Sequence, residues 1–275
     1  MHYPSLEAWL CHDKSGWNYD AKLPLGRKLF IDGKPLRDLV IPDGTTSIKE
    51  SAFQGVGGLE HVVIPDSVAE IGEYAFASCK DLKDVTLPKG ITRISNEAFA
   101  WCDALTRIVI PDGVTEIGYT ALKGCSSLTE VVIPHSVTTI EKSAFKGCKA
   151  LKRIVIPEGV QTIAGGVFNE CCSLEEILLP ESVTSIGGGA FSDCTALETI
   201  KLPDSLENTG KGLFWGCCKL ARIKIPAGWS VINESTFKKC SSLKTIDLSE
   251  GVTAVGESAF EYCDNLRIIS ISGSL

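Results

Sequence analysis

The sequence predicts a solenoid rich in β-structure, built from a 23-residue unit that repeats along most of its 275 residues. Two rows of matching residues carry this prediction. Proline recurs every 23 residues from Pro42 to Pro226. Phenylalanine recurs at the same interval from Phe53 to Phe260, with Leu122 in one of the positions. A fixed period of this length is the signature of stacked repeats, each of which completes a core only with its neighbours.

Each unit is expected to contribute a short strand just before its proline. In the unit that begins at Leu59, Val62 and Ile64 are two residues apart, which places both side chains on one face of a strand. Stacked copies of this strand form a parallel sheet with about 4.8 Å between rungs. Pro65 then ends the strand, because proline has no N–H for the ladder and its φ suits a turn.

The second half of the unit predicts a further inward row and a tight turn. Val68 and Ile71 form the next apolar pair. The five residues that follow, 72–76, are too few for a long helix, so we expect a single helical or 3₁₀ turn. Ala75 and Phe76 are expected to pack inward from this turn.

The first 35 residues depart from the period. The step from Leu6 to Leu36 is 30 residues instead of 23. Within it, apolar residues before Asp32-Gly33 predict a β-hairpin, since Asp-Gly favours a tight primed turn. We therefore expect an irregular N-terminal cap with a hairpin over residues 1–35, which covers the first face of the core. Residues 36–275 are expected to form one continuous solenoid of about ten 23-residue repeats.

Composition limits the classes of partner. The net charge of −7 argues against a general binder of nucleic acid or anionic membranes. No apolar run approaches the ~20 residues needed to span a bilayer, so membrane insertion is not expected. The first 20 residues lack the basic start and apolar run of a signal peptide. The chain is thus cytoplasmic if this N-terminus is native, or its leader has been removed.

The repeat resembles a known family. The pattern Leu-x-x-Ile-x-Ile-Pro, then Val-x-x-Ile, then Ala-Phe-x-x-Cys is similar to the BspA-like branch of the leucine-rich repeats, and residues 105–118 and 137–148 are close to its consensus. The resemblance implies an α/β-type, β-rich, right-handed leucine-rich repeat solenoid, with a parallel sheet on the concave side and short helical or 3₁₀ turns on the convex side. Members are typically surface or secreted proteins of bacteria and some protozoa that act in adhesion or protein binding. A location at the cell surface or outside the cell is therefore expected.

Cysteine is the first candidate for chemistry. Two of the 12 cysteines, Cys172 and Cys218, fall on a mostly polar row and are expected to be more exposed. Nine others recur every 23 residues: Cys79, Cys102, Cys125, Cys148, Cys171, Cys194, Cys217, Cys240 and Cys263. We interpret these nine as buried free thiols that pack as small apolar groups. Their Cβ vectors would run parallel, which argues against disulfides, and no Cys-x-x-Cys spacing indicates a metal site.

Acidic residues after the prolines are the second candidate. Stacked carboxylates could bind calcium, but Asp is also favoured in Pro-Asp-Gly turns for backbone reasons. We favour the turn interpretation and leave the calcium alternative open. The row contains Asp43, Asp66, Asp112, Glu158, Glu181, Asp204 and Glu250.

Nothing in the sequence indicates catalysis or a cofactor. The four histidines, His2, His12, His61 and His135, are scattered, and none pairs visibly with a nucleophile. The glycine clusters near residues 165, 188 and 211 lack the context of a phosphate loop. We interpret them instead as residues that relax the backbone of the short turn before the phenylalanine. We expect no enzyme, no catalytic residue, no metal and no cofactor.

The strongest functional signal lies on the outward positions of the first strand. One outward row alternates in charge, which favours pairing between neighbouring rungs and a self-satisfied surface. The other row is apolar over four rungs, as interaction sites are, although β-branched residues are also simply good strand formers. We predict a binding surface of Arg107, Val109, Glu130, Val132, Arg153, Val155, Glu176, Leu178, Lys201, Arg222 and Lys224.

These observations favour a non-enzymatic recognition scaffold that binds a protein or glycan partner through the concave sheet, as in adhesion or host interaction at a cell surface. The alternative is a passive spacer or stalk, in which the repeats serve only to set how far the protein extends. About eleven rungs at ~4.8 Å give a length of roughly 50 Å.

Overall fold

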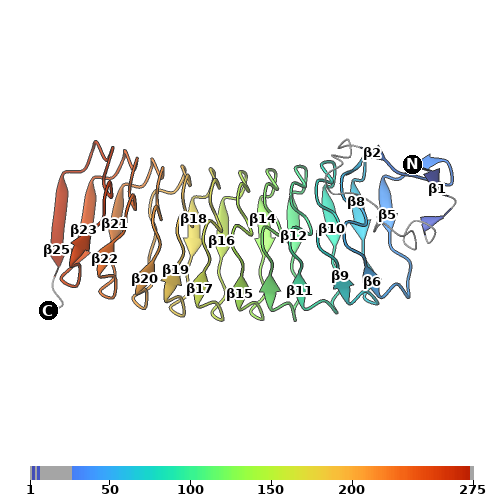
Figure 1. The fold of residues 1–275 in the computed structure, drawn as a ribbon, viewed down its shortest axis with the longest axis horizontal. Coiled ribbons are helices and arrows are strands. Elements are labelled where there is room, and N and C mark those ends of the chain that lie inside the picture. The colour runs from blue at the N-terminus through green and yellow to red at the C-terminus, as the bar shows by residue number, and fades with distance from the viewer. Residues whose placement is uncertain (1, 4, 7–26, 273–275) are drawn as a thin grey trace.

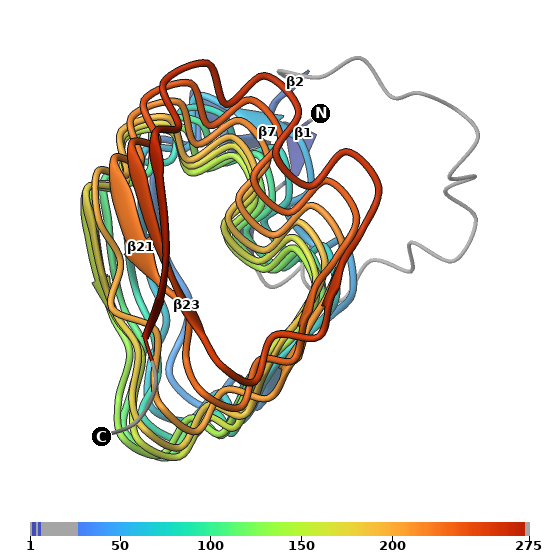
Figure 2. The same cartoon turned by 90° about the vertical axis from the view of Figure 1, so that its left-hand side faces the viewer.

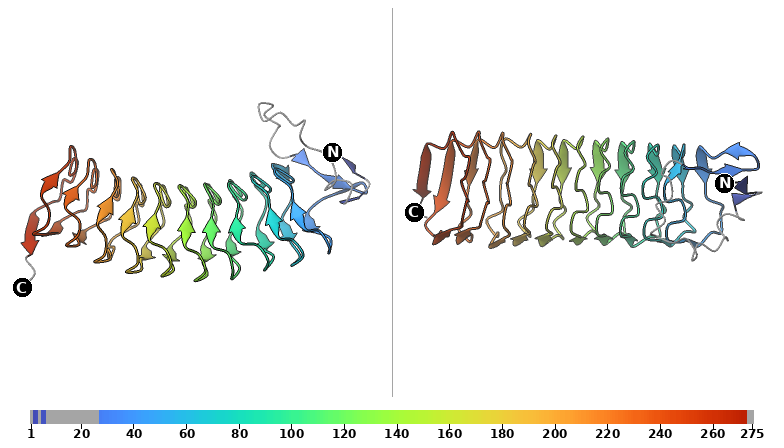
Figure 3. Two further views of the ribbon diagram at one scale, coloured as in Figure 1. Left: turned by 60° about the horizontal axis from the view of Figure 1, so that its bottom comes forward. Right: turned by 45° about the horizontal axis from the view of Figure 1, so that its top comes forward.

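A computed structural model describes residues 2–3, 5–6 and 27–272 of the chain. Rungs follow one another in chain order along a single axis, and the stack bends into a shallow arc (Figures 1 and 3). Viewed along the axis, the successive coils superimpose (Figure 2). Most coils contain two short strands: the predicted one before the proline, and a second one that was not predicted from the sequence.

The first strand of each coil precedes the proline row. Neighbouring first strands pair parallel and in register, so that Val109 lies beside Val132, and Val155 beside Leu178. The ladder is divided into the groups β5–β8–β10, β12–β14, β16–β18 and β21–β23–β25. The first strands are β5 (Asp38–Val40), β8 (His61–Val63), β10 (Asp84–Thr86), β12 (Arg107–Val109), β14 (Glu130–Val132), β16 (Arg153–Val155), β18 (Glu176–Leu178), β21 (Arg222–Lys224), β23 (Thr245–Ser249) and β25 (Ile268–Ser272).

The second strand of each coil carries the next inward row. Ile117, Ile140 and Ile163 are examples, each less than 3 % exposed. The second strands are β6 (Ser47–Ile48), β9 (Glu70–Ile71), β11 (Arg93–Ile94), β13 (Glu116–Ile117), β15 (Thr139–Ile140), β17 (Thr162–Ile163), β19 (Ser185–Ile186), β20 (Asn208–Thr209), β22 (Val231–Ile232) and β24 (Ala254–Val255).

The third side of each coil is a turn, and we call the surface that these turns form the turn face. It comprises residues 72–79 and their equivalents every 23 residues. No helix occurs between residues 27 and 272, so the expected helical or 3₁₀ turn is not found there. The physical reason is visible in the turn at residues 72–79, where Tyr74 and Ser78 have φ values of 57° and 59°. Two left-handed residues within five cannot continue a right-handed helix.

The glycine clusters now have a structural role. Gly166, Gly189 and Gly212 occupy the first left-handed position of their turns, with φ between 62° and 65°. Glycine adopts this region at little cost, whereas L-residues with side chains do not. The expectation that these glycines relax the turn before the phenylalanine is confirmed.

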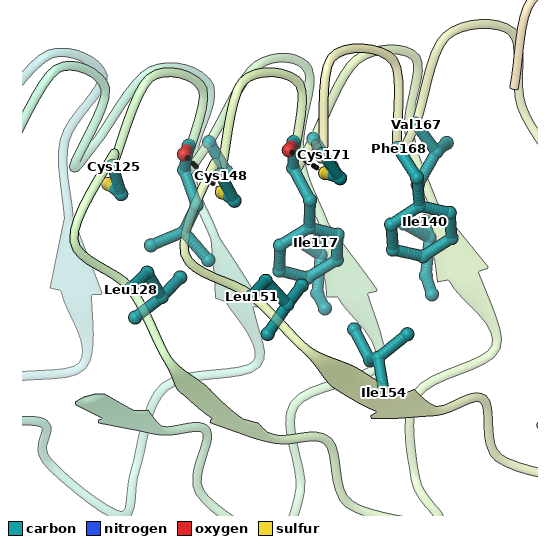
Figure 4. Close-up of a cluster of buried hydrophobic side chains, with 14 of the residues drawn as sticks. Ile117, Cys125, Leu128, Ile140, Cys148, Leu151, Ile154, Val167, Phe168 and Cys171 are labelled. Atoms are coloured by element: carbon teal, nitrogen blue, oxygen red, sulfur yellow. Dashed lines mark hydrogen bonds between the residues drawn. The ribbon is translucent and has the colours of Figure 1, made fainter. Parts of the chain in front are cut away.

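The core is a set of parallel rows. Phe76 stacks between Phe53 and Phe99 with ring centroids 5.2 and 5.5 Å away. A second stack runs from Phe145 to Phe260, and Leu122 separates the two. Figure 4 shows Phe168, Leu151 and Ile154 converging on the interior below the turns. These buried rows hold one continuous apolar core from Leu29 to Ala259.

The described part of the N-terminal segment forms short strands at one end of the stack (Figure 1). β3 (Phe30–Ile31) pairs antiparallel with β4 (Lys34–Pro35) through a turn in which Asp32 and Gly33 both have positive φ. β1 (His2–Tyr3) pairs with β3, and β2 (Arg27–Lys28) pairs with β7 (Val56–Gly57). The expected division into a cap over residues 1–35 and a solenoid over 36–275 stays a prediction.

Candidate binding surface

The outward side chains of the first strands form a continuous apolar stripe over four rungs. Val109, Val132, Val155 and Leu178 are between 41 and 46 % exposed. Strand periodicity explains this, because the residues just before them, such as Ile108 and Ile154, point inward and are 1 % exposed. The stripe therefore lies outside the core and can contact a partner without unfolding the coil.

The charged row beside the stripe is paired within the strand groups. Arg107 Nε lies 3.2 Å from Glu130 Oε2, and Arg153 Nε lies 2.6 Å from Glu176 Oε2. These two ion pairs join β12 to β14 and β16 to β18, the same strands that share ladders. These charges neutralise each other in pairs. The rim of the apolar stripe therefore requires no opposite charge from a partner.

The basic residues predicted at the C-terminal end of the surface separate into different environments. Arg222 pairs with Asp247 at 2.8 Å. That bond, together with the hydroxyl of Ser270, lowers the pKa of Asp247, with the Ser270 contact the larger cause. Lys201 lies outside any strand, contrary to the expected rung geometry, and its Nζ reaches Glu181 at 3.4 Å. Lys224 lies at the end of β21 and stays exposed.

Sequence reasoning missed an N-terminal extension of the stripe. Val40 and Val63 occupy the same outward position on β5 and β8 and are 64 and 44 % exposed. Thr86 on β10 separates them from Val109. The same alternation that revealed the four central residues would have found these two, had the row been followed to its start.

A charged network borders that extension. Glu60 contacts both Lys83, at 2.6 Å, and Arg37, at 2.8 Å. Hydrogen bonds from Lys83 and then Arg37 hold the pKa of Glu60 at about 2. His61 Nδ1 lies 2.5 Å from Asp84 Oδ2 on the next rung. This arrangement keeps the N-terminal rim paired, as on the central rungs.

The cysteine ladder is confirmed as free in the described part of the chain, and it is buried from Cys79 to Cys240, whereas Cys263 at its end is partly exposed. Each thiol donates to the carbonyl oxygen of the phenylalanine-row residue 26 positions earlier, as Cys171 Sγ does to Phe145 at 3.2 Å (Figure 4). Burial raises the pKa of Cys171 to about 12. Cys172 and Cys218 are partly exposed, as expected, while Cys11 lies outside the described residues.

The acidic turn row makes backbone contacts. Asp66 Oδ1 accepts the N–H of Lys89 at 2.9 Å, and Glu181 Oε2 accepts the N–H of Asp204 at 3.0 Å. These bonds tie one turn to the next and support the turn interpretation. Within the described ranges, no three His, Cys, Asp or Glu side chains lie close enough to share a metal ion.

A shallow hollow opens on the second-strand side. It spans β15 and β17, has a volume of about 510 Å³, and is lined by side chains such as Thr139, Gln161 and Thr162. No basic residue and only one carboxylate, Glu141, lines it. The hollow therefore offers hydroxyl and amide contacts without the apolar area of the first-strand stripe.

The turn face carries exposed aromatic residues that sequence reasoning did not consider. Trp101, Tyr119, Trp215 and Tyr262 are between 41 and 59 % exposed. The signal was present in the sequence, since the positions equivalent to Trp101 hold small or polar residues in most other repeats.

In the described residues, no helix is long and apolar enough to cross a membrane.

Comparison with known proteins gives the context of these features. Residues 24–152 and 161–275 match the family described as BspA type Leucine rich repeat region. A leucine-rich repeat protein from Bacteroides ovatus is 28 % identical, with a TM-score of 0.60 over 86 % of this chain and 82 % of that one. The pneumococcal vaccine antigen PcpA shares the fold at 22 % identity and a TM-score of 0.52, over 91 and 74 % of the two chains. A leucine rich cell surface protein from Faecalibacterium prausnitzii is 28 % identical over 86 and 88 %, with a TM-score of 0.45. Among curated proteins, no sequence matches.

Proposed function

Because the chain belongs to the BspA-type leucine-rich repeat family, we propose that it is a non-enzymatic recognition scaffold that binds a protein or glycan partner through its first-strand sheet. The site comprises the apolar stripe of Val109, Val132, Val155 and Leu178, with its rim of paired charges and the basic group around Arg222. The context is adhesion or host interaction, with the chain at the cell surface or secreted.

One observation carries the proposal. Four branched aliphatic side chains on consecutive rungs are each more than 40 % exposed, whereas the residues just before them, such as Ile108 and Ile154, are buried in the core. A folded protein leaves contiguous apolar surface of this kind where a partner covers it. The Arg107–Glu130 and Arg153–Glu176 pairs supply the polar rim that surrounds such contacts.

The rim also predicts how the partner binds. Its charges are already matched within the chain, so a partner gains little by adding its own. Affinity is therefore expected to come from desolvation of Val132, Val155 and their neighbours, with weak dependence on salt. A stable protein interface buries about 800 Å² on each side, which requires the flanking side chains as well as the stripe.

The rival function is a passive spacer. In that case the outward valines serve only as good strand formers, and no ligand depends on them. The two functions predict different effects on partner binding when the stripe is made polar and the fold is retained. A matched pair of variants tests this difference.

The experiment compares binding by the wild-type chain and two double variants. Val132→Lys with Val155→Lys interrupts the stripe, and Thr139→Lys with Thr162→Lys places two lysines on the second strands of the same rungs. Cell-surface extracts and a glycan array are passed over each immobilised protein. A partner retained by the wild type and the threonine variant, but released faster by the valine variant, supports the proposal. Equal retention by both variants favours the spacer.

A further inference from the structure

Exposed aromatic rings on the turn face form a pattern distinct from the first-strand stripe. Within residues 27–272, the aromatic side chains that are more than 40 % exposed are Trp101, Tyr119, Trp215 and Tyr262, and all four lie in turns. They stand as isolated rings, separated by polar residues and glycine. This arrangement offers flat stacking surfaces without a continuous apolar area.

Trp101 occupies a conformation that suits a smaller residue. Its φ is 61°, in the left-handed region, where a bulky L-residue is disfavoured. Its indole lies over Gly124 of the next rung, where a Cβ would come within 2.2 Å of Trp101 Cε3. Ser78 and Lys239 at the equivalent positions have φ values of 59° and 63°, so this backbone conformation belongs to the repeat, and what distinguishes Trp101 is its large side chain, 46 % exposed.

Lysines stand beside this ring on the next two rungs. The Trp101 N–H donates to the carbonyl oxygen of Lys123 at 2.6 Å, and the Gly124 N–H donates to that of Lys146 at 2.7 Å. These bonds place the three residues on adjoining rungs. Lys123 Nζ lies 5.3 Å from the centre of the indole, within cation–π range. An ammonium group is therefore held over an exposed indole ring.

The same rungs add a second ring and a third lysine. Tyr119, 46 % exposed, begins the turn that contains Thr120. The Thr120 N–H donates to the carbonyl oxygen of Lys142 at 3.1 Å, so Lys142 borders this turn. Thr120 itself is 2 % exposed, and its Oγ1 is the buried side-chain oxygen without a hydrogen-bond partner in the described residues.

Two carboxylates near this group have partners of their own, and Lys146 is one of these partners. Glu97 interacts with Tyr74 on the preceding rung, where burial and then this carboxylate raise the pKa of Tyr74. Glu170 pairs with Lys146 at 3.1 Å. In the part of the chain that the structure describes, Lys123 and Lys142 have no carboxylate within ion-pair distance. Two free ammonium groups on a protein of net charge −7 form a local basic patch.

We propose that this turn-face patch, formed by Trp101, Tyr119, Lys123, Lys142 and Lys146, binds an acidic polysaccharide. The C–H face of a sugar ring stacks on an exposed indole or phenol, and the carboxylate or sulfate groups of the chain accept hydrogen bonds from the lysines. A protein partner would need contiguous desolvated area around the rings, which the glycine and polar residues of this face do not provide. The patch spans three rungs, or about 10 Å, so it contacts a short stretch of an extended chain.

The test uses polygalacturonate as the acidic probe and its fully methyl-esterified form as the neutral counterpart, in native affinity electrophoresis with a chelator present. We expect polygalacturonate to retard the wild-type protein and the neutral polymer to leave it unretarded. Trp101→Gly should weaken binding at least tenfold without loss of the fold, because glycine fits the left-handed position. Lys123→Gln should weaken it severalfold and flatten its salt dependence.

Tyr262→Gly is the matched control. Tyr262 is also exposed and left-handed, with φ of 60°, but it lies at the far end of the stack from Lys123. This variant should bind polygalacturonate as the wild type does. Absence of retardation at any practical polymer concentration, or equal retardation by the neutral polymer, would overturn the proposal. Binding that survives Trp101→Gly and Lys123→Gln but is lost in the Val132→Lys, Val155→Lys variant would assign the polysaccharide to the first-strand face instead.

Discussion

The thiol of Cys125 donates a hydrogen bond to the carbonyl oxygen of Phe99 at 3.2 Å, linking the cysteine row of one rung to the aromatic row of the preceding one. Both residues are fully buried. Each ladder thiol repeats this contact, so the cysteine row gives a second donor to a buried carbonyl oxygen that already accepts a backbone N–H, as Phe99 does from Cys102 at 3.4 Å.

Thiol reactivity should divide the cysteines into two classes. Burial raises the pKa of Cys79 and Cys125 to about 12, so roughly one molecule in ten thousand carries the thiolate at pH 8. We expect Cys172 and Cys218 to react with a disulfide reagent in the native protein, and the eight buried ladder thiols from Cys79 to Cys240 to react only after unfolding. The double variant Cys172→Ser, Cys218→Ser should lose the corresponding fast phase. Several intramolecular disulfides in the purified protein would contradict the buried-thiol interpretation.

The same raised pKa values predict alkaline destabilisation. The unfolded chain ionises its thiols from about pH 9, whereas the folded chain keeps Cys125 protonated up to about pH 12. Proton binding is thus stronger in the folded state. The stability that this burial contributes is complete below pH 9 and declines as the pH rises towards 12. Urea midpoints measured between pH 7 and 11 should be flat and then fall, with a shallower fall for Cys125→Ala.

The aromatic row should contribute unequally along its length. Phe191 stacks on both sides, at 5.9 Å from Phe168 and 5.5 Å from Phe214. Phe145 has Phe168 on one side and Leu122 on the other. We expect Phe191→Ala to lower the free energy of unfolding by about 3–5 kcal/mol. Phe145→Ala should cost less, by about 0.5–1.5 kcal/mol, because one aromatic pair is missing. Denaturant melts that show a loss below about 1 kcal/mol for both would contradict the core assignment.

A side chain at a left-handed turn position should cost stability even when it meets no other atom. Gly147 has a φ of 73°, and a Cβ there would meet no atom closer than 3.6 Å. Gly147→Ala therefore isolates backbone strain from steric clash, and we expect a loss of about 1–2 kcal/mol. Gly90 is the control, since its φ lies outside the left-handed region and a Cβ there makes only ordinary contacts, the nearest at 3.6 Å. Gly90→Ala should be neutral or slightly stabilising in the same thermal melts.

The binding-surface variants should keep their fold. Val132 and Val155 point away from the core, so Val132→Lys with Val155→Lys is expected to change the free energy of unfolding by no more than about 0.5 kcal/mol for each substitution. Circular dichroism and a melting curve on the purified double variant measure this directly. Unfolding of this variant would place the two side chains inside the coil and invalidate the inward and outward assignment.

The sequence was sufficient to predict the inward rows because their periodicity follows from strand geometry and a fixed repeat. Leu59, Val62, Ile64 and Phe76 are all at most 2 % exposed, as expected. The backbone conformation of the turn was harder to predict. Tyr74 and Ser78 give no local sign of a left-handed backbone, and only the glycines at equivalent positions of other repeats, such as Gly166 and Gly147, indicate it.

Side-chain pairing was predictable only in part. Alternating charge on the first strands predicted contacts between neighbours, and Arg107 does meet Glu130. The alternation did not reveal with which of its two neighbouring rungs each charged residue forms its ion pair, because that depends on where the first-strand ladder divides. The position of Lys201 outside a strand has no explanation in the structure.

The division of the strand ladders has a mechanical consequence. β3 and β25 lie at opposite ends of the stack (Figure 1), so a pull between them acts along the axis and loads the hydrogen bonds between rungs one after another. Across the junction between β14 and β16 the second strands β15 and β17 stay paired, whereas between the rung of β20 and the rung of β21 and β22 the described strands share neither ladder. Tension should open the stack at the second of these junctions first, then release whole coils, each extending by about 80 Å of chain. A force-extension trace with steps of this length would show that the protein yields gradually as an extensible tether.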